Sequence, residues 1–158
     1  MPTPDPKITR DVLFLCTGNY YSSRFAEELF NYHAAKDGLQ QKAYSLGFTP
    51  HPLTNPGAIS VYAMNALAVR GIRPFEPTRM PAAVCFEDFF RYQHCIALSE
   101  SEHRPMMQTM FPQFLSRVIF WNVEDLAWEH PRSATTKIEA NVLELLKSFK
   151  NQLSMESD

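Results

Sequence analysis

The feature that most restricts the fold is a short apolar run followed by a glycine-containing loop and an amphipathic segment. The run ends at Cys16, the loop contains Gly18 and Asn19, and a helix is predicted to begin at Ser23. Similar runs alternate with helical patterns along the chain, which is typical of parallel strands joined by crossover helices. The sequence therefore predicts an α/β fold with three layers, a four-stranded parallel sheet with helices on both faces. The predicted strands cover residues 12–16, 42–46, 94–98 and 118–121.

Capping patterns set the expected starts of the later helices. These starts are Asn55-Pro56-Gly57, Ser99 with Glu102, and Thr136 with Glu139. A short helix is also expected over residues 86–92, with Phe89 and Phe90 buried.

The loop after the first strand is suited to an anion. The first backbone N–H groups of a helix lack intrahelical partners and carry partial positive charge. A loop wrapped around them therefore binds a phosphate-sized group. Cys16 precedes this loop, and the same positive field favours a thiolate that can attack phosphorus. The alternative is a buried structural cysteine, which is common at the end of a strand.

The residues of this loop resemble a known signature. Leu15-Cys16-Thr17-Gly18-Asn19, followed by Ser23, Ala26 and Glu27, is similar to the loop of the low-molecular-weight protein tyrosine phosphatases, a family that includes thioredoxin-coupled arsenate reductases. The resemblance covers nearly the whole chain. It implies that Cys16 is the nucleophile, that Asn19 locks the unusual loop backbone, and that Ser23 hydrogen-bonds the thiolate. The residues it implies for phosphate or substrate binding are Thr17, Gly18, Asn19, Tyr20, Tyr21 and Ser22.

One position departs from the family pattern of cysteine, five residues and arginine. Ser22 stands where the arginine is expected, and an arginine follows two residues later as Arg24. A guanidinium gives a phosphoryl group two charge-assisted hydrogen bonds, whereas a serine hydroxyl gives one neutral bond. Arg24 is a candidate to supply the missing charge in phosphate binding. Its position about 200° around the helix from Ser22 predicts instead that it points away.

The loop after the last predicted strand contains the candidate general acid. Glu124 and Asp125 lie there, and the carboxyl ends of parallel strands line one crevice. A carboxyl group in that crevice can protonate the oxygen that leaves phosphorus. The resemblance implies Asp125, although Leu126 stands where proline is usual, and Glu124 is the second choice. The alternative for both is a solvated loop acid.

Aromatic residues near both loops are candidates to contact the substrate. Trp128 either forms an aromatic wall of the site, as the resemblance implies, or packs on the C-terminal helix. Tyr20 and Tyr21 would narrow the entrance and favour planar groups such as phosphotyrosine.

Composition restricts the partners and the chemistry. The net charge of −2 argues against a nucleic-acid partner, and no apolar run is long enough for a membrane span. Three cysteines without an export signal predict reduced thiols and a cytoplasmic location. Neither cysteine nor histidine spacing matches a metal site, so no metal and no cofactor are expected. The length suits one domain over residues 11–153, preceded by a flexible tail over residues 1–10.

Three functional hypotheses follow. The first is a cysteine-dependent phosphomonoester hydrolase of the protein tyrosine phosphatase type, which forms a phosphocysteine on Cys16 and uses Asp125 as acid and base. The second is a relative that binds phosphate or phosphotyrosine with little turnover because of Ser22. The third is an arsenate reductase, which needs Cys85 and Cys95 as redox partners. Both of these cysteines are more naturally interpreted as structural thiols.

Overall fold

The sheet has four parallel strands in the order β2-β1-β3-β4. The computed structural model describes residues 11–51, 56–124 and 131–156, and the structural statements below concern these residues. The strands are β1 (Val12–Cys16), β2 (Ala43–Gly47), β3 (His94–Ala97) and β4 (Val118–Phe120). The helices are α1 (Ser22–Lys36), α2 (Val61–Val69), α3 (Asp88–Arg91), α4 (Glu100–Met110), the 3-10 helix η1 (Pro112–Arg117) and α5 (Pro131–Glu156). The predicted α/β class and the four-stranded parallel sheet are confirmed.

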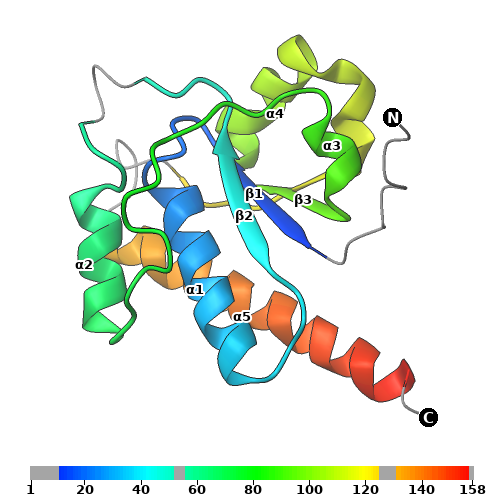
Figure 1. Cartoon of the computed structure of the whole chain (residues 1–158). Helices are drawn as coiled ribbons and strands as arrows, with labels where there is room; N and C mark the ends of the chain where they lie inside the picture. Colours follow the sequence, from blue (N-terminus) through cyan, green and yellow to red (C-terminus); the bar gives the residue numbers. More distant parts are fainter. Residues whose placement is uncertain (1–10, 52–55, 125–130, 157–158) are drawn as a thin grey trace, which may run out of the picture.

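Helices cover both faces of the sheet (Figure 1). Along β1, Val12 and Phe14 belong to one hydrophobic cluster, with side chains from α1, α2 and α5. Leu13 and Leu15 belong to a second cluster, with side chains from α3, α4 and η1. Successive strand residues point to opposite faces, so β1 is apolar throughout because both of its faces are covered.

Two helices, α2 and α5, begin more than three residues away from the expected starts. The start of α2 is set by Ser60, whose Oγ accepts a hydrogen bond of 3.1 Å from the backbone N–H of Tyr62. Gly57 has φ +89, which a right-handed helix does not allow, so the expected start was wrong. Asn55 lies outside the described residues. The long helix α5 already includes Pro131, and the Thr136 hydroxyl donates to the carbonyl of Arg132 (2.8 Å) instead of capping a helix start.

The short helix α3 buries one of the two expected phenylalanines. Phe89 is fully buried, whereas Phe90 is 60% exposed, so its predicted burial was wrong. A four-residue helix presents only one face to the core, and Phe89 occupies it. In the part of the chain that the structure describes, no helix has the length and apolarity needed to cross a membrane.

Candidate active site

The loop between β1 and α1 adopts a backbone conformation that depends on Asn19 and on Gly47. Asn19 has φ +52, a left-handed conformation that asparagine tolerates better than most residues. The loop packs closely against the end of β2. A Cβ atom on Gly47 would lie 2.8 Å from the backbone nitrogen of Asn19 and 2.9 Å from the backbone carbonyl oxygen of Thr17. Glycine at position 47 therefore allows the close approach that shapes this loop.

A directed chain of hydrogen bonds supports the Cys16 sulfur. The Asn19 amide oxygen accepts from the backbone N–H of Ala82 (3.0 Å), which fixes the orientation of the amide. Its nitrogen then donates to Ser45 Oγ (2.9 Å) and to Ser23 Oγ (3.2 Å). Ser23 Oγ lies 2.9 Å from Cys16 Sγ. Because Ser23 already accepts from Asn19, its own hydrogen is available to a Cys16 thiolate.

Cys16 lies at a cavity of about 510 Å³. The cavity is bounded by the loop, by residues near the start of α2, by the first turn of α4 and by the chain after β4. Of the residues expected to bind phosphate or substrate, Thr17, Gly18, Tyr20, Tyr21 and Ser22 line it. Asn19 and Ser23 are buried behind them. The Cys16 side chain is thus mostly buried and yet faces a space large enough for a phosphoryl group and its leaving group.

The two loop tyrosines are tied to the surrounding chain. Tyr20 donates to the carbonyl of Pro56 (2.6 Å), and Tyr21 donates to the carbonyl of Pro131 (3.3 Å). The ring of Tyr21 also meets that of Tyr62 edge to face, with centroids 6.3 Å apart. Both tyrosines are therefore held at the cavity by contacts outside the loop.

Arg24 does not contribute to this cavity. Its side chain is 1% exposed and forms ion pairs with Glu27 (3.0 Å) and Glu28 (3.3 Å). The guanidinium also donates to the carbonyl of Glu76 (2.6 Å). This geometry gives no support to phosphate binding by Arg24, because all of these partners lie away from the cavity lining. The position of Arg24 on α1 turns its side chain away from Ser22.

Of the two candidate general acids, Asp125 and Glu124, the structure describes only Glu124. Asp125 and Trp128 lie outside the described residues. Glu124, the residue before Asp125, lines the cavity and accepts a hydrogen bond of 3.3 Å from Ser101 Oγ. The chain that follows β4 therefore reaches the Cys16 cavity, which is the edge of the sheet at which the acid was expected.

Two further residues of the cavity lining, Glu102 and His103, lie on α4 and were not expected from the sequence. The hydroxyl of Thr17 donates to the Glu102 carboxylate and lies 3.2 Å from His103 Nε2. His103 is 2% exposed, and burial lowers its pKa to about 4. The carboxyl ends of parallel strands line one crevice, which is why the loop after β4 was expected at the site. The same reasoning applies to the chain after β3, where both residues lie.

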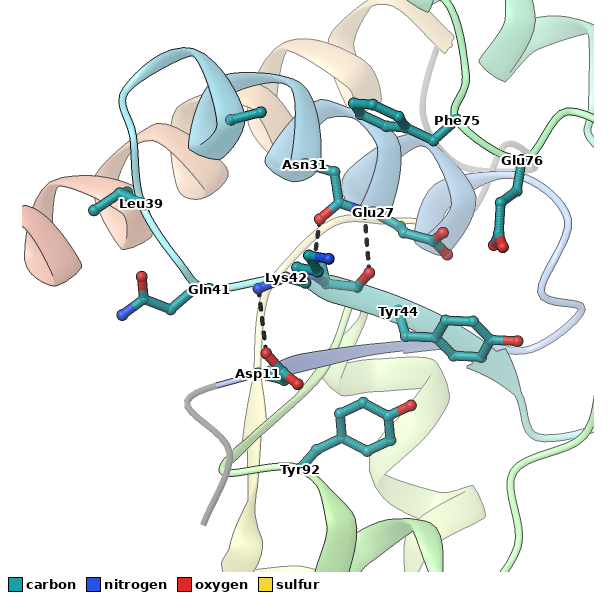
Figure 2. Close-up of a pocket in the computed structure, with 12 residues that line it drawn as sticks. Asp11, Glu27, Asn31, Leu39, Gln41, Lys42, Tyr44, Phe75, Glu76 and Tyr92 are labelled. Carbon is teal, nitrogen blue, oxygen red and sulfur yellow. Dashed lines mark hydrogen bonds between the residues drawn. The ribbon is translucent and has the colours of Figure 1, made fainter. Parts of the chain in front are cut away.

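A second cavity, of about 490 Å³, lies along the free edge of β2 (Figure 2). There the Asn31 amide pairs with the backbone N–H (2.8 Å) and carbonyl (3.0 Å) of Ala43 and covers the strand edge. Asp11 accepts a hydrogen bond from the Lys42 backbone in the same region. No cysteine or histidine is among the described residues that line this cavity. The cavity at Cys16 is therefore the candidate active site.

The other two cysteines lie apart from the cavity lining. Cys95 is 1% exposed within β3, and burial raises its pKa to about 11. Cys85 is exposed, and a hydrogen bond with Asp88 raises its pKa.

Comparisons with known proteins identify a family for this chain. Residues 11–155 match the family model described as low molecular weight phosphotyrosine protein phosphatase. A search of curated proteins gives no match.

Three solved structures illustrate the shared fold. The low molecular weight protein tyrosine phosphatase from T. tengcongensis has a TM-score of 0.71 at 20% identity, covering 89% of this chain and 99% of that one. The YwlE arginine phosphatase from Geobacillus stearothermophilus has a TM-score of 0.72 at 20% identity, and the match covers 90% of this chain and 94% of that one. A thioredoxin-dependent arsenate reductase from Corynebacterium glutamicum has a TM-score of 0.68 at 19% identity, and the match covers 92% of this chain and 64% of that one. The structural likeness establishes the fold, and the match to the family model establishes that the chain belongs to the low molecular weight phosphotyrosine protein phosphatase family.

Proposed function

We propose that this phosphatase-family chain is a phosphomonoester hydrolase that forms a phosphocysteine on Cys16. The single observation that carries the proposal is the position of the Cys16 sulfur, at the cavity and 2.9 Å from Ser23 Oγ. The loop precedes the N-terminus of α1, where free N–H groups and the helix dipole favour an anion. A serine hydroxyl beside the sulfur stabilises a thiolate both before attack and as it is regenerated.

The reaction has two steps. The thiolate attacks phosphorus, the bond from phosphorus to the leaving oxygen breaks, and Asp125 gives that oxygen a proton. Asp125, now a carboxylate, then takes a proton from the water that attacks the phosphocysteine. The sulfur–phosphorus bond breaks and phosphate leaves, which restores the thiolate and the protonated acid. The cavity position of Glu124, one residue earlier, supports this role for Asp125.

Phosphotyrosine is the substrate type that the loop tyrosines favour. Tyr20 and Tyr21 line the cavity and are held there by their bonds to Pro56 and Pro131. Flat aromatic side chains at an entrance pack well against an aryl ring. Peptides with phosphotyrosine, phosphoserine and phosphoarginine should be compared, because structural neighbours include an arginine phosphatase. Equal rates on phosphoserine and phosphotyrosine peptides would contradict the preference.

Hydrolysis of p-nitrophenyl phosphate tests the nucleophile. We expect Cys16→Ser to reduce the rate to that of the uncatalysed reaction, since a serine hydroxyl is a far weaker nucleophile than a thiolate. Cys85→Ser is the matched control and should retain the activity, because Cys85 is exposed and lies outside the cavity lining. Activity that survives Cys16→Ser would refute the proposal.

The second candidate function is binding of phosphate or phosphotyrosine without useful turnover. Ser22 favours it, because this residue lines the cavity at the position of the family's arginine and carries no charge. An arginine that stabilises phosphoryl transfer is worth about 10³ to 10⁵ in rate. Phosphotyrosine binding by calorimetry, together with an absence of Cys16-dependent hydrolysis, would support this second function.

Arsenate reduction has less support. It needs a relay of thiols that reach Cys16, and Cys95 is held inside the sheet on β3. Oxidation of thioredoxin that depends on arsenate and on this protein is the assay that would revive it.

A further inference from the structure

A directed hydrogen-bond chain at the start of α4 has no role in the proposed reaction. The backbone N–H of Ser99 donates to His103 Nδ1 (3.0 Å), so this ring nitrogen is the acceptor. The proton of the neutral ring therefore lies on Nε2, which is 3.2 Å from Thr17 Oγ1. Thr17 in turn donates its hydroxyl hydrogen to Glu102. Each group in the chain thus directs its hydrogen toward the next, and the chain ends at the Glu102 carboxylate.

The sequence predicts a capping box of Ser99 and Glu102 at the start of α4, but the Glu102 carboxylate does not take part in it. Half of the capping box forms, because Ser99 Oγ accepts from the backbone N–H of Glu102 (3.4 Å). In the other half, the glutamate side chain would accept from the Ser99 N–H. That N–H is bonded to His103 instead, so Glu102 is held by Thr17 of the phosphate-binding loop and lines the cavity.

Glu102 lies at a cavity whose described lining includes two histidines, His51 and His103. His103 is buried and uncharged at neutral pH, since burial lowers its pKa to about 4. Glu124 adds a second carboxylate to the lining. Among the described lining residues there is no lysine or arginine, and Ser22 replaces the family's arginine. A substrate that is only anionic meets repulsion from the Glu102 carboxylate, whereas one that also carries a positive group gains attraction.

We propose that Glu102 determines specificity at the Cys16 cavity by selecting phosphomonoesters whose leaving group carries a positive charge. Thr17 and His103 are positioning residues that hold its carboxylate. The inference rests on the proposed function to the extent that the cavity binds a phosphoryl group. The cation comes either from a basic residue beside the phosphorylated residue of a peptide or from an amine on a small aryl ester.

Binding to the Cys16→Ser protein separates this inference from catalysis. The ligands are two aryl phosphates of the same shape, one with a para aminomethyl group and one with a para carboxymethyl group. We expect the cationic ester to bind about tenfold more tightly by calorimetry, since it exchanges a repulsion for an attraction. Phosphotyrosine peptides flanked by lysine or by glutamate form the second arm. A preference in either arm supports the proposal, and its size in each arm identifies the source of the cation.

Variants of the same protein assign the preference to Glu102. Glu102→Gln should remove most of the difference in affinity between the two esters. Thr17→Val should reduce this difference, because it removes the hydroxyl that donates to the Glu102 carboxylate. Glu100→Gln is the matched control, because Glu100 pairs with Arg104 and is not part of the cavity lining. This control should keep the preference.

Equal affinities for the two esters and for the two peptides would overturn the inference. So would a preference that persists in Glu102→Gln, or an absence of binding by all four ligands. Failure of the proposed function has a different signature, namely p-nitrophenyl phosphate hydrolysis by the unaltered protein that does not depend on Cys16.

Discussion

At the scale of single residues, the serine at position 22 is expected to limit the turnover of the proposed reaction. Ser22 begins α1 and lines the cavity beside Cys16. The arginine nearest in sequence, Arg24, is 1% exposed and bonded to Glu27 and Glu28. Removing it from those partners would leave the buried Glu28 carboxylate without its cation, which is strongly unfavourable, while Glu27 would keep its ion pair with Arg79. Under the proposed function, a phosphoryl anion would therefore be bound by backbone N–H groups and hydroxyl groups.

Ser22→Arg is predicted to increase kcat/KM for p-nitrophenyl phosphate by about 10³- to 10⁵-fold, because a guanidinium binds the transition-state charge with two hydrogen bonds. Steady-state kinetics of the variant beside the unaltered protein measures this gain. Ser22→Lys is the matched control and should give a smaller gain, since an ammonium group lacks the planar fork. Persistent inactivity of Ser22→Arg would favour the binding function over catalysis.

At the scale of the secondary-structure element, α4 carries a titratable group that links stability to pH. Burial lowers the folded-state pKa of His103 to about 4, below its ordinary value of 6.5. The unfolded chain therefore binds a proton in the interval between these values while the folded chain does not. Stability from this residue is complete above the ordinary value and is lost as the pH falls through the interval.

The variant His103→Gln isolates this contribution. Between about pH 7.5 and about pH 5, the free energy of unfolding should decrease by about 2 kcal/mol less in the variant than in the unaltered protein. Urea unfolding of both proteins at the two pH values measures the difference. Glutamine retains a donor and an acceptor but does not titrate. Equal decreases in the two proteins would show that His103 does not cause the acid sensitivity.

At the scale of the whole molecule, the sheet separates two hydrophobic clusters that share no residues. Phe30 of α1 belongs to one cluster and meets Phe149 of α5 edge to face, with ring centroids 6.1 Å apart. Phe89 of α3 belongs to the other and stacks on Phe114, with centroids 4.9 Å apart. Substitutions on opposite faces of the sheet should therefore act independently.

A double-mutant cycle tests this separation. Phe30→Leu and Phe89→Leu are each expected to cost about 1 to 2 kcal/mol, and their effects should add within about 0.5 kcal/mol. The pair Phe30→Leu and Phe149→Leu is the control and should deviate from additivity by more than this, because the two rings touch. Urea unfolding provides the four free energies of each cycle. Strong coupling between Phe30 and Phe89 would contradict two independent clusters.

Local patterns in the sequence were enough to predict the sheet and the loop between β1 and α1. The run that forms the central strand β1 is apolar because both of its faces are covered, and the Cys16 loop lies within one short segment. The predicted starts of α2 and α5 were wrong. Both helices pack against α1, and tertiary contacts of this kind override local capping patterns.

The sequence by itself determined the order of strands and helices and the position of Cys16 at the mouth of a helix N-terminus, because these depend on neighbouring residues and on backbone hydrogen bonding. Only the tertiary structure decided that Arg24 is buried with Glu27 and Glu28 and that Glu102 and His103 meet Thr17. Thr17 is 85 positions from Glu102 in the chain. Contacts of that kind arise when β1 and β3 pair side by side and bring their carboxyl ends together, which no local pattern of residues records.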